Sequence, residues 1–177
     1  MTHNHCYNHD MNDEIVNIVD RNDNIIGTKR RVELADEDII RVSSLWVEDG
    51  KGNVLLQQRA FSKIHAGGQW QPAVAGTVEA NESYLENIIR ETEEEIGLKN
   101  LEPQEVEKKF LEFPDLKSQR MVMYYKAICN QPIEFFNPEI GEVEQLKWIN
   151  KEDLRLDVEK NPYKYVRSAT IWKELFY

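Results

Sequence analysis

The chain has 177 residues, a length that fits one domain with a sizeable hydrophobic core. Its formal net charge of −10 argues against a broad surface for long nucleic acids, although a small phosphorylated substrate needs only a few local cations and a metal ion. No stretch approaches the roughly 18 apolar residues of a membrane span; with two cysteines and no apolar secretory signal, the chain is expected in a reducing cytoplasm.

The first residues, 1–13, carry three histidines and a cysteine in a polar, terminal stretch. Their spacing fits no structural zinc pattern, and polar termini are usually poorly ordered. We therefore expect a flexible tail at 1–13. Residues 14–177 are expected to form a single domain, because they contain no internal repeat, low-complexity segment or linker.

Alternating apolar residues between turn signals predict strands in the first half of the chain. A β-hairpin is expected from strands 14–20 and 25–31 around a turn at 21–24, followed by a short helical turn within 32–40. The next expected elements are strands 41–48 and 54–59 joined by the turn sequence DGKGN, a loop at 60–69, and one strand over 70–79.

A helix of about three to four turns is predicted to begin near Tyr84. Ser83 and Glu86 have the spacing of a capping box, and Gly97 is suited to the left-handed cap just past the helix end. Apolar residues at helical spacing predict one buried stripe, made of Leu85, Ile88, Ile89 and Ile96.

In the second half, strands are predicted at 105–113, 120–128 and 142–149. Asn150 with Asp153 is expected to cap a second helix, and Pro162 to open a third that continues through 171–176. Strands on both sides of a central helix, with helices closing the chain, predict an α/β (α+β) fold in which a mixed β-sheet lies between helical layers.

Three glutamates of the central helix, Glu91, Glu94 and Glu95, share one arc beside the apolar stripe. Like charges three or four residues apart destabilise a helix, and clustering makes carboxylates harder to ionise. A hard divalent cation such as Mg²⁺ or Mn²⁺ would remove this conflict, since it prefers carboxylate, water and phosphate oxygens. Arg90, one turn before Glu94, is placed to bridge to it. The alternative is a solvated acidic face, the usual role of a glutamate run.

The spacing within residues 76–98 resembles the Nudix box, in which a glycine is followed after five residues by Glu, and after seven more by Arg-Glu, an apolar residue, any residue, Glu-Glu, any residue, Gly and an apolar residue. The matching positions are Gly76, Glu82, Arg90, Glu91, Glu94, Glu95, Gly97 and Leu98. Thr92 stands where an aliphatic residue is usual, but its methyl group can still pack. More weakly, the leading hairpin and residues 58–70 resemble the branch that includes isopentenyl diphosphate isomerase and its hydrolase relatives.

This resemblance implies a Nudix-type α/β/α sandwich and a metal-dependent hydrolase that cleaves a diphosphate linkage in a small nucleoside-diphosphate-type or related compound. It implies that Glu91, Glu94 and Glu95 bind Mg²⁺ or Mn²⁺, with Glu82 as a further ligand or water contact. It also assigns Glu94, Glu95 and Arg90 to catalysis. Gly76 would let the backbone approach the site where a side chain would crowd it.

Substrate phosphates also need cations, and Arg59 and Lys63 match places where this branch often has basic residues. The alternative for each is an ordinary exposed side chain. Arg41 and the run 29–31 are weaker candidates. Glu142 and Glu144 are the nearest candidates for a general base outside the box. Two further residues have a functional and an ordinary interpretation, and the ordinary one is favoured for both: Trp70 as core and His65 as a loop residue.

Two other functions remain as alternatives. Isopentenyl diphosphate isomerases use a cysteine just upstream of the box, but this chain has no cysteine between Cys6 and Cys129, which argues against isomerisation. A non-catalytic Nudix-fold nucleotide-binding regulator would be expected to lose box carboxylates, and all are present here. The sequence leaves the substrate open, because Nudix specificity lies in loops and termini. It also leaves a homodimer open.

Overall fold

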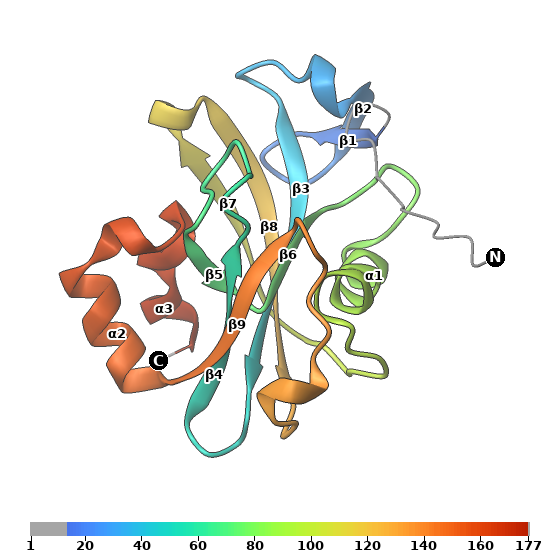
Figure 1. Ribbon diagram of the computed structural model, residues 1–177. Helices are drawn as coiled ribbons and strands as arrows, with labels where there is room; N and C mark the ends of the chain where they lie inside the picture. The colour runs from blue at the N-terminus through green and yellow to red at the C-terminus, as the bar shows by residue number, and fades with distance from the viewer. Residues whose placement is uncertain (1–13, 177) are drawn as a thin grey trace.

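The computed structural model describes residues 14–176, so the tail predicted at 1–13 lies outside the described residues. Nine strands of the described residues join in one mixed β-sheet (Figure 1). The strands are β1 (Ile15–Val19), β2 (Ile25–Arg30), β3 (Ile39–Glu48), β4 (Asn53–Arg59), β5 (Trp70–Pro72), β6 (Val74–Thr77), β7 (Gln104–Phe113), β8 (Ser118–Ile128) and β9 (Val143–Asn150). The helices are α1 (Tyr84–Ile96), α2 (Lys151–Lys160) and α3 (Trp172–Phe176).

Strand β3 organises the sheet. Along one edge it pairs with β8 in parallel over its whole length, from Ile39 opposite Gln119 to Glu48 opposite Ile128. Its other edge pairs antiparallel with three strands in succession: β1, then β6, then β4. Strand β6 is followed, after residues 78–83, by α1, so this pairing holds the chain beside β3 just before the central helix.

Helices cover both faces of the sheet, with α1 on one side and α2 and α3 on the other (Figure 1). Successive β3 residues point to opposite faces, as a strand requires. Leu45 and Val47 join a core cluster with Ile88 and Ile96 of α1, whereas Trp46 joins a second cluster with α2 and α3. The predicted α/β/α sandwich with a mixed sheet is therefore confirmed.

The second cluster is largely aromatic. The Trp46 ring stacks on Phe176 of α3, with centroids 4.3 Å apart and planes 5° apart, and it meets Trp172 edge-on at 5.6 Å. Full burial of such side chains stabilises a fold by about 1.5–3 kcal/mol each. Across residues 14–176, the structure contains no helix that is long and apolar enough to span a membrane.

Most predicted strands are confirmed, including the β1–β2 hairpin, and the helical turn expected within 32–40 begins one residue earlier, at Arg31–Glu33. The single strand predicted over 70–79 is wrong. The chain leaves the edge of β4 after Pro72 and joins the edge of β3 at Val74, so two short strands, β5 and β6, replace it. Asn150 caps α2 as predicted, but its side chain accepts from the Glu152 backbone N–H at 3.0 Å.

The continuous third helix predicted from Pro162 is also wrong. Pro162 opens a 3₁₀ turn of three residues, Pro162–Lys164, and a second 3₁₀ segment, Arg167–Ile171, precedes the five-residue α3. Tertiary contacts decide this region, because the Val166 backbone N–H donates to Trp70 O of β5 at 3.0 Å. A continuous helix would use that N–H internally.

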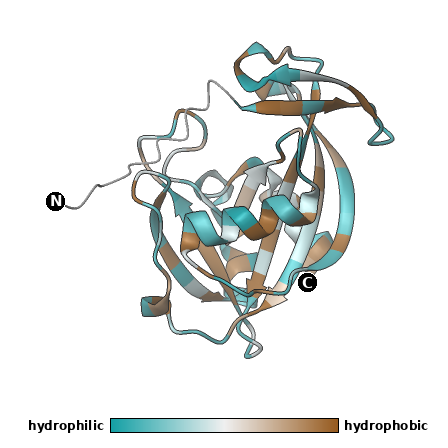
Figure 2. Cartoon of the chain, turned by 90° about the vertical axis from the view of Figure 1, so that its right-hand side faces the viewer, coloured by the Kyte–Doolittle hydropathy of each residue, from teal (hydrophilic) through white to brown (hydrophobic). Residues whose placement is uncertain are grey.

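The predicted ends of α1 are confirmed: Ser83 and Glu86 form the capping box, and Gly97 has a left-handed φ of 69°. The predicted apolar stripe is only half right. Ile88 and Ile96 are fully buried, but Leu85 and Ile89 are 42% and 47% exposed. The buried face instead includes Tyr84, Asn87, Thr92 and Glu95. Figure 2, in which α1 faces the viewer, shows both hydrophilic and hydrophobic segments on its outer side.

Candidate metal and phosphate site

Helix α1 brings Glu91 directly onto strand β6. A Cβ atom added to Gly76 would lie 2.5 Å from Glu91 Cδ and 2.5 Å from its Cγ, closer than real carbon contacts allow. The Glu91 side chain therefore occupies the space that any larger residue at 76 would need. The sequence predicts that Gly76 leaves room at the site, but it does not identify Glu91 of α1 as the side chain that fills this room.

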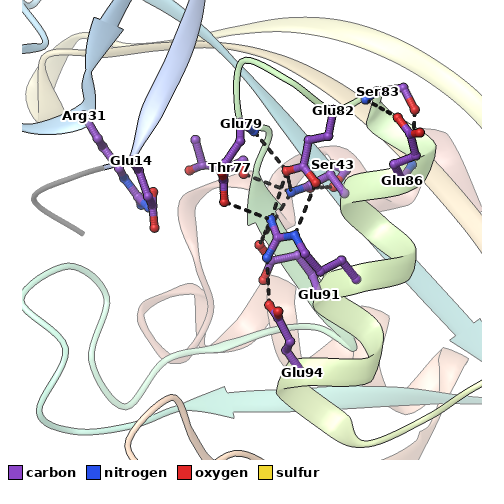
Figure 3. Close-up of polar contacts among 12 residues, drawn as sticks. Glu14, Arg31, Ser43, Thr77, Glu79, Glu82, Ser83, Glu86, Glu91 and Glu94 are labelled. Atoms are coloured by element: carbon purple, nitrogen blue, oxygen red, sulfur yellow. Dashed lines mark hydrogen bonds and ion pairs between the residues drawn. The ribbon is translucent and has the colours of Figure 1, made fainter. Parts of the chain in front are cut away.

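Arg90 connects three glutamates of the box, Glu82, Glu91 and Glu94, which are labelled in Figure 3. Its Nη1 donates to Glu94 Oε2 at 2.7 Å, as the helical spacing predicts, and its Nη2 donates to Glu82 Oε1 at 2.9 Å. The same Nη2 lies 3.1 Å from Glu91 Oε1. Burial lowers the pKa of Arg90, but its hydrogen bonds with Glu82 and the nearby negative charges outweigh this and raise it. The guanidinium therefore stays charged and fixes these three carboxylates.

Asn87 supports the same network, and the sequence analysis did not single it out. It is fully buried, and its Nδ2 donates to Glu82 Oε1 at 2.7 Å and to Thr77 O of β6 at 2.9 Å. Its Oδ1 accepts from the Ser43 hydroxyl of β3. Asn87 could have been noticed in the sequence as a polar residue among apolar helix positions. A buried amide needs hydrogen-bond partners, which here belong to the site.

Glu91 and Glu95 are the carboxylates of this cluster whose pKa values are raised. Burial raises the pKa of Glu91 to about 7, opposed by the charge of Arg90 and reinforced by Glu94. Glu95 is only 7% exposed, and burial together with the Glu91 charge raises its pKa well above the usual range. Its neighbour Gln57 can donate to Glu95 Oε2 at 3.1 Å and to Ala73 O at 2.6 Å. Two adjacent carboxylates are therefore costly to ionise together.

These donors fit a hard divalent cation chemically, because they are carboxylate oxygens whose charges are poorly compensated. Within residues 14–176, however, no three acidic, histidine or cysteine side chains are already gathered as a ligand set. Arg90 forms ion pairs with Glu82 and Glu94 in this arrangement. The bond from Arg90 uses Glu94 Oε2, and a carboxylate has a second oxygen that can coordinate an ion.

The predicted phosphate contacts, Arg59 and Lys63, lie at the end of β4 and in the loop that follows it, beside the start of β9. The charge of Arg59, at the end of β4, lowers the pKa of Glu95, while that of Glu142 raises it. Arg59 Nη1 donates to Gln71 Oε1 at 3.4 Å, and Gln71 Nε2 is buried with no acceptor among the described residues. Lys63 forms an ion pair with Glu142. The structure thus brings Arg59, Lys63 and Glu142 together beside the box.

The weaker basic candidates lie elsewhere. Arg41 donates to Asp23 Oδ1 at 2.7 Å, Lys29 pairs with Asp38 at 2.6 Å, and Arg31 pairs with Glu14 at 2.5 Å. Arg30 ends the exposed strand β2.

The remaining candidates, Trp70, His65 and Glu144, lie away from the box glutamates or on the surface. Trp70 packs against the second core cluster, with Lys147 Nζ 3.8 Å from its ring centroid, so it lies on the side of α2 and α3. His65 is exposed, and its backbone oxygen accepts from Arg59 Nε at 3.2 Å. Glu144 is exposed on β9.

Comparisons with known proteins agree with this geometry. The family model for the NUDIX domain matches residues 39–169. An isopentenyl-diphosphate Delta-isomerase of Serratia proteamaculans is 30% identical over 178 residues, covering 92% of each chain. An uncharacterized Nudix hydrolase of Streptomyces coelicolor is 36% identical over 100 residues, covering 56% of this chain and 55% of that one.

Among solved structures, the Deinococcus radiodurans protein DR0079 superposes with a TM-score of 0.78 at 17% identity, covering 93% of this chain and all of that one. That likeness concerns the fold. The matched residues contain the whole glycine-to-glycine spacing of the box and the helix that carries it. The chain therefore belongs to the NUDIX domain family, in the branch that includes isopentenyl-diphosphate isomerase-like proteins.

Proposed function

We propose that this protein is a Nudix pyrophosphohydrolase that uses Mg²⁺ or Mn²⁺ to cleave a diphosphate linkage in a small nucleoside-diphosphate-type compound. The observation that carries the proposal is the pair Glu91 and Glu95. Glu95 is buried and Glu91 partly buried, both have raised pKa values, and Gly76 leaves room for the Glu91 side chain. Such perturbed groups cluster at functional sites.

Each residue has a role in this proposal. Glu91, Glu94 and Glu95 would hold the ion, and Arg90 with Glu82 would orient them. When bound, the ion neutralises phosphate charge and lowers the pKa of the attacking water. Arg59 and Lys63 would bind phosphate oxygens.

The Lys63–Glu142 ion pair links substrate binding to proton transfer. A substrate phosphate that draws Lys63 away would leave Glu142 free to accept a proton from water. Glu142 is favoured over Glu144 as the base because its charge is near enough to Glu95 to raise the pKa of that residue.

The isomerase-named relatives make isomerisation the second candidate. Against it, strand β6 has Ala75 and no cysteine. Within residues 14–176 the sole cysteine is Cys129, which is buried in the first core cluster.

A hydrolysis screen tests the proposal. With Mg²⁺ or Mn²⁺, the protein is expected to cleave the diphosphate linkage, into two phosphorylated products, in at least one member of a panel of nucleoside triphosphates, ADP-ribose, dinucleotide polyphosphates, CoA derivatives and isoprenoid diphosphates. It is expected not to convert isopentenyl diphosphate to its dimethylallyl isomer. Formation of the dimethylallyl isomer at a rate above that of the metal-free blank would favour the isomerase over the hydrolase.

Phosphate contacts are tested by kinetics. Arg59→Ala and Lys63→Ala should each raise KM for the best substrate more than they lower kcat, because these contacts are already made before the transition state. Glu142→Gln should instead lower kcat. Lys51→Ala, in the exposed β3–β4 turn, is the control and should change neither constant. Unchanged kinetics in the Arg59 and Lys63 variants would assign both to the solvated surface.

A further inference from the structure

Gln71 is a buried side chain on the face of the sheet that α1 covers. It stands opposite Gln57 in the pairing of β4 with β5 and is only 4% exposed. Gln57 can donate to Glu95 Oε2 of α1 at 3.1 Å, which places its side chain on the α1 face. Directly opposite residues of an antiparallel pair share a face, so Gln71 lies there as well. Trp70, its neighbour in β5, packs on the other face, as strand alternation requires.

Arg59 belongs to the same group of side chains. It follows Gln57 by two residues in β4, so both side chains leave the strand on the same face. A direct contact agrees with this placement, because Arg59 Nη1 donates to Gln71 Oε1 at 3.4 Å. The side chains of Gln57, Gln71 and Arg59 therefore form a row that begins at the Glu95 carboxylate. A diphosphate that contacts both Glu95 through a metal ion and Arg59 would lie beside Gln71.

The amide of Gln71 is only half satisfied. A guanidinium can donate but not accept, so the amide atom that faces Arg59 is the oxygen, and the nitrogen is turned away from it. That nitrogen, Nε2, is buried and has no acceptor among the described residues. A buried donor without an acceptor is costly and is rare in folded proteins. Gln57 shows the contrast, since its amide nitrogen can donate to both Glu95 and Ala73.

Arg59 also has donors to spare. Its Nε donates to His65 O at 3.2 Å and its Nη1 to Gln71, and among residues 14–176 no carboxylate pairs with it. Lys63, in contrast, forms an ion pair with Glu142. Two neighbouring strands thus offer a charged donor and a neutral donor at one place. A phosphate group has several strong acceptor oxygens and can accept from both at once.

We infer that Gln71 is a further substrate-binding residue: its Nε2 donates to an oxygen of the phosphate that Arg59 binds, while its Oε1 holds the Arg59 guanidinium in place. This inference rests on the proposed hydrolase function. An amide does not titrate, so Gln71 transfers no proton and contributes to substrate binding alone. Its loss should therefore change KM more than kcat.

Gln71→Met tests the contact, because Met keeps the length of the side chain and removes both the donor and the acceptor. In the full chain it should raise KM for the best substrate of the hydrolysis panel by about tenfold or more, since hydrogen bonds to charged groups are the stronger kind. Gln71→Glu should raise KM further, because an anion then faces the phosphate. Gln119→Met makes the same exchange in β8 and should keep the parental KM. A parental KM in Gln71→Met would overturn the inference.

A double-mutant cycle separates a direct contact from an effect through Arg59. If Gln71 only held Arg59 in place, adding Gln71→Met to Arg59→Ala would change KM no further. We expect a further rise in KM in the double variant, because a donor to the phosphate is lost as well. Equal KM values in Arg59→Ala and in the double variant would refute the direct contact.

A binding test needs no turnover. With Mg²⁺, the non-hydrolysable pyrophosphate analogue imidodiphosphate should raise the Tm of the parent and of Gln119→Met, and that of Gln71→Met clearly less. Without ligand, Gln71→Met should melt no lower than the parent, because it removes a buried donor that has no acceptor. If imidodiphosphate stabilises Gln71→Met as much as the parent, the inference fails even if hydrolysis is found. Binding that depends on Gln71, without hydrolysis of any panel member, would refute the hydrolase proposal alone.

Discussion

Replacing Glu95 with Gln is expected to remove most turnover without destabilising the metal-free protein. Gln keeps the size of the side chain, and the parent carboxyl is buried with a pKa raised by burial and by the charge of Glu91. Removing that charge removes repulsion, so the free energy of unfolding should stay the same or rise slightly. Activity should fall by more than the roughly 10- to 100-fold that loss of an outer-shell partner costs a metal site.

The same variant should lose the response to metal. A ligand that binds only the folded state stabilises it by mass action, by about 2.7 kcal/mol when its concentration is 100 times Kd. Millimolar Mg²⁺ should therefore raise the Tm of the parent clearly, and that of Glu95→Gln or Glu94→Gln much less. Melting curves with and without Mg²⁺, beside an activity assay, measure both effects.

Glu93→Gln is the matched control. Glu93 lies on the same helix, but its side chain is 50% exposed and pairs with Lys99 at 2.5 Å, outside the box positions. It should keep the full Mg²⁺ shift and full activity. If Glu94→Gln and Glu95→Gln also keep full Mg²⁺-dependent activity, these glutamates do not bind the catalytic ion and the family resemblance is misleading about the site.

The ends of α1 could be predicted from the sequence because capping is local. Ser83, Glu86 and Gly97 act within a few residues, and the spacing alone places Arg90 beside Glu94. The buried face of α1 could not be predicted, because it is set by partners far along the chain. Asn87 turns toward β3 and β6, which carries Tyr84 and Thr92 into the core and leaves Leu85 and Ile89 partly exposed.

The same distinction holds for the site outside the helix. Arg59 and Lys63 were found only through the family resemblance, and their distance from Glu95 depends on how β4, its following loop and the residues before β9 meet.

Replacing Gly76 with Ala is expected to be almost as damaging to function as loss of a glutamate. The added Cβ would lie 2.5 Å from Glu91 Cγ and Cδ, so Glu91 must rotate away from β6. Overpacking in a rigid core costs about 1–3 kcal/mol, and because a glutamate side chain can move, the cost here should be at the lower end. The Glu91 carboxylate would then lie farther from Glu95. Misplacement of a reacting group by about 1 Å can lower the rate by about 100-fold.

Gly27→Ala provides the control for this substitution. Gly27 lies in β2, its φ is not positive, and a Cβ there would meet nothing within 4 Å. This variant should keep its Tm, its Mg²⁺ shift and its turnover, whereas Gly76→Ala should fold with a modestly lower Tm, show little Mg²⁺ shift and lose most turnover. Thermal melts with and without Mg²⁺ and kcat/KM for the best substrate distinguish the two. A Gly76→Ala variant with the parental Mg²⁺ shift and parental kcat/KM would show that Glu91 does not need its place beside β6, and that the metal ligands lie elsewhere.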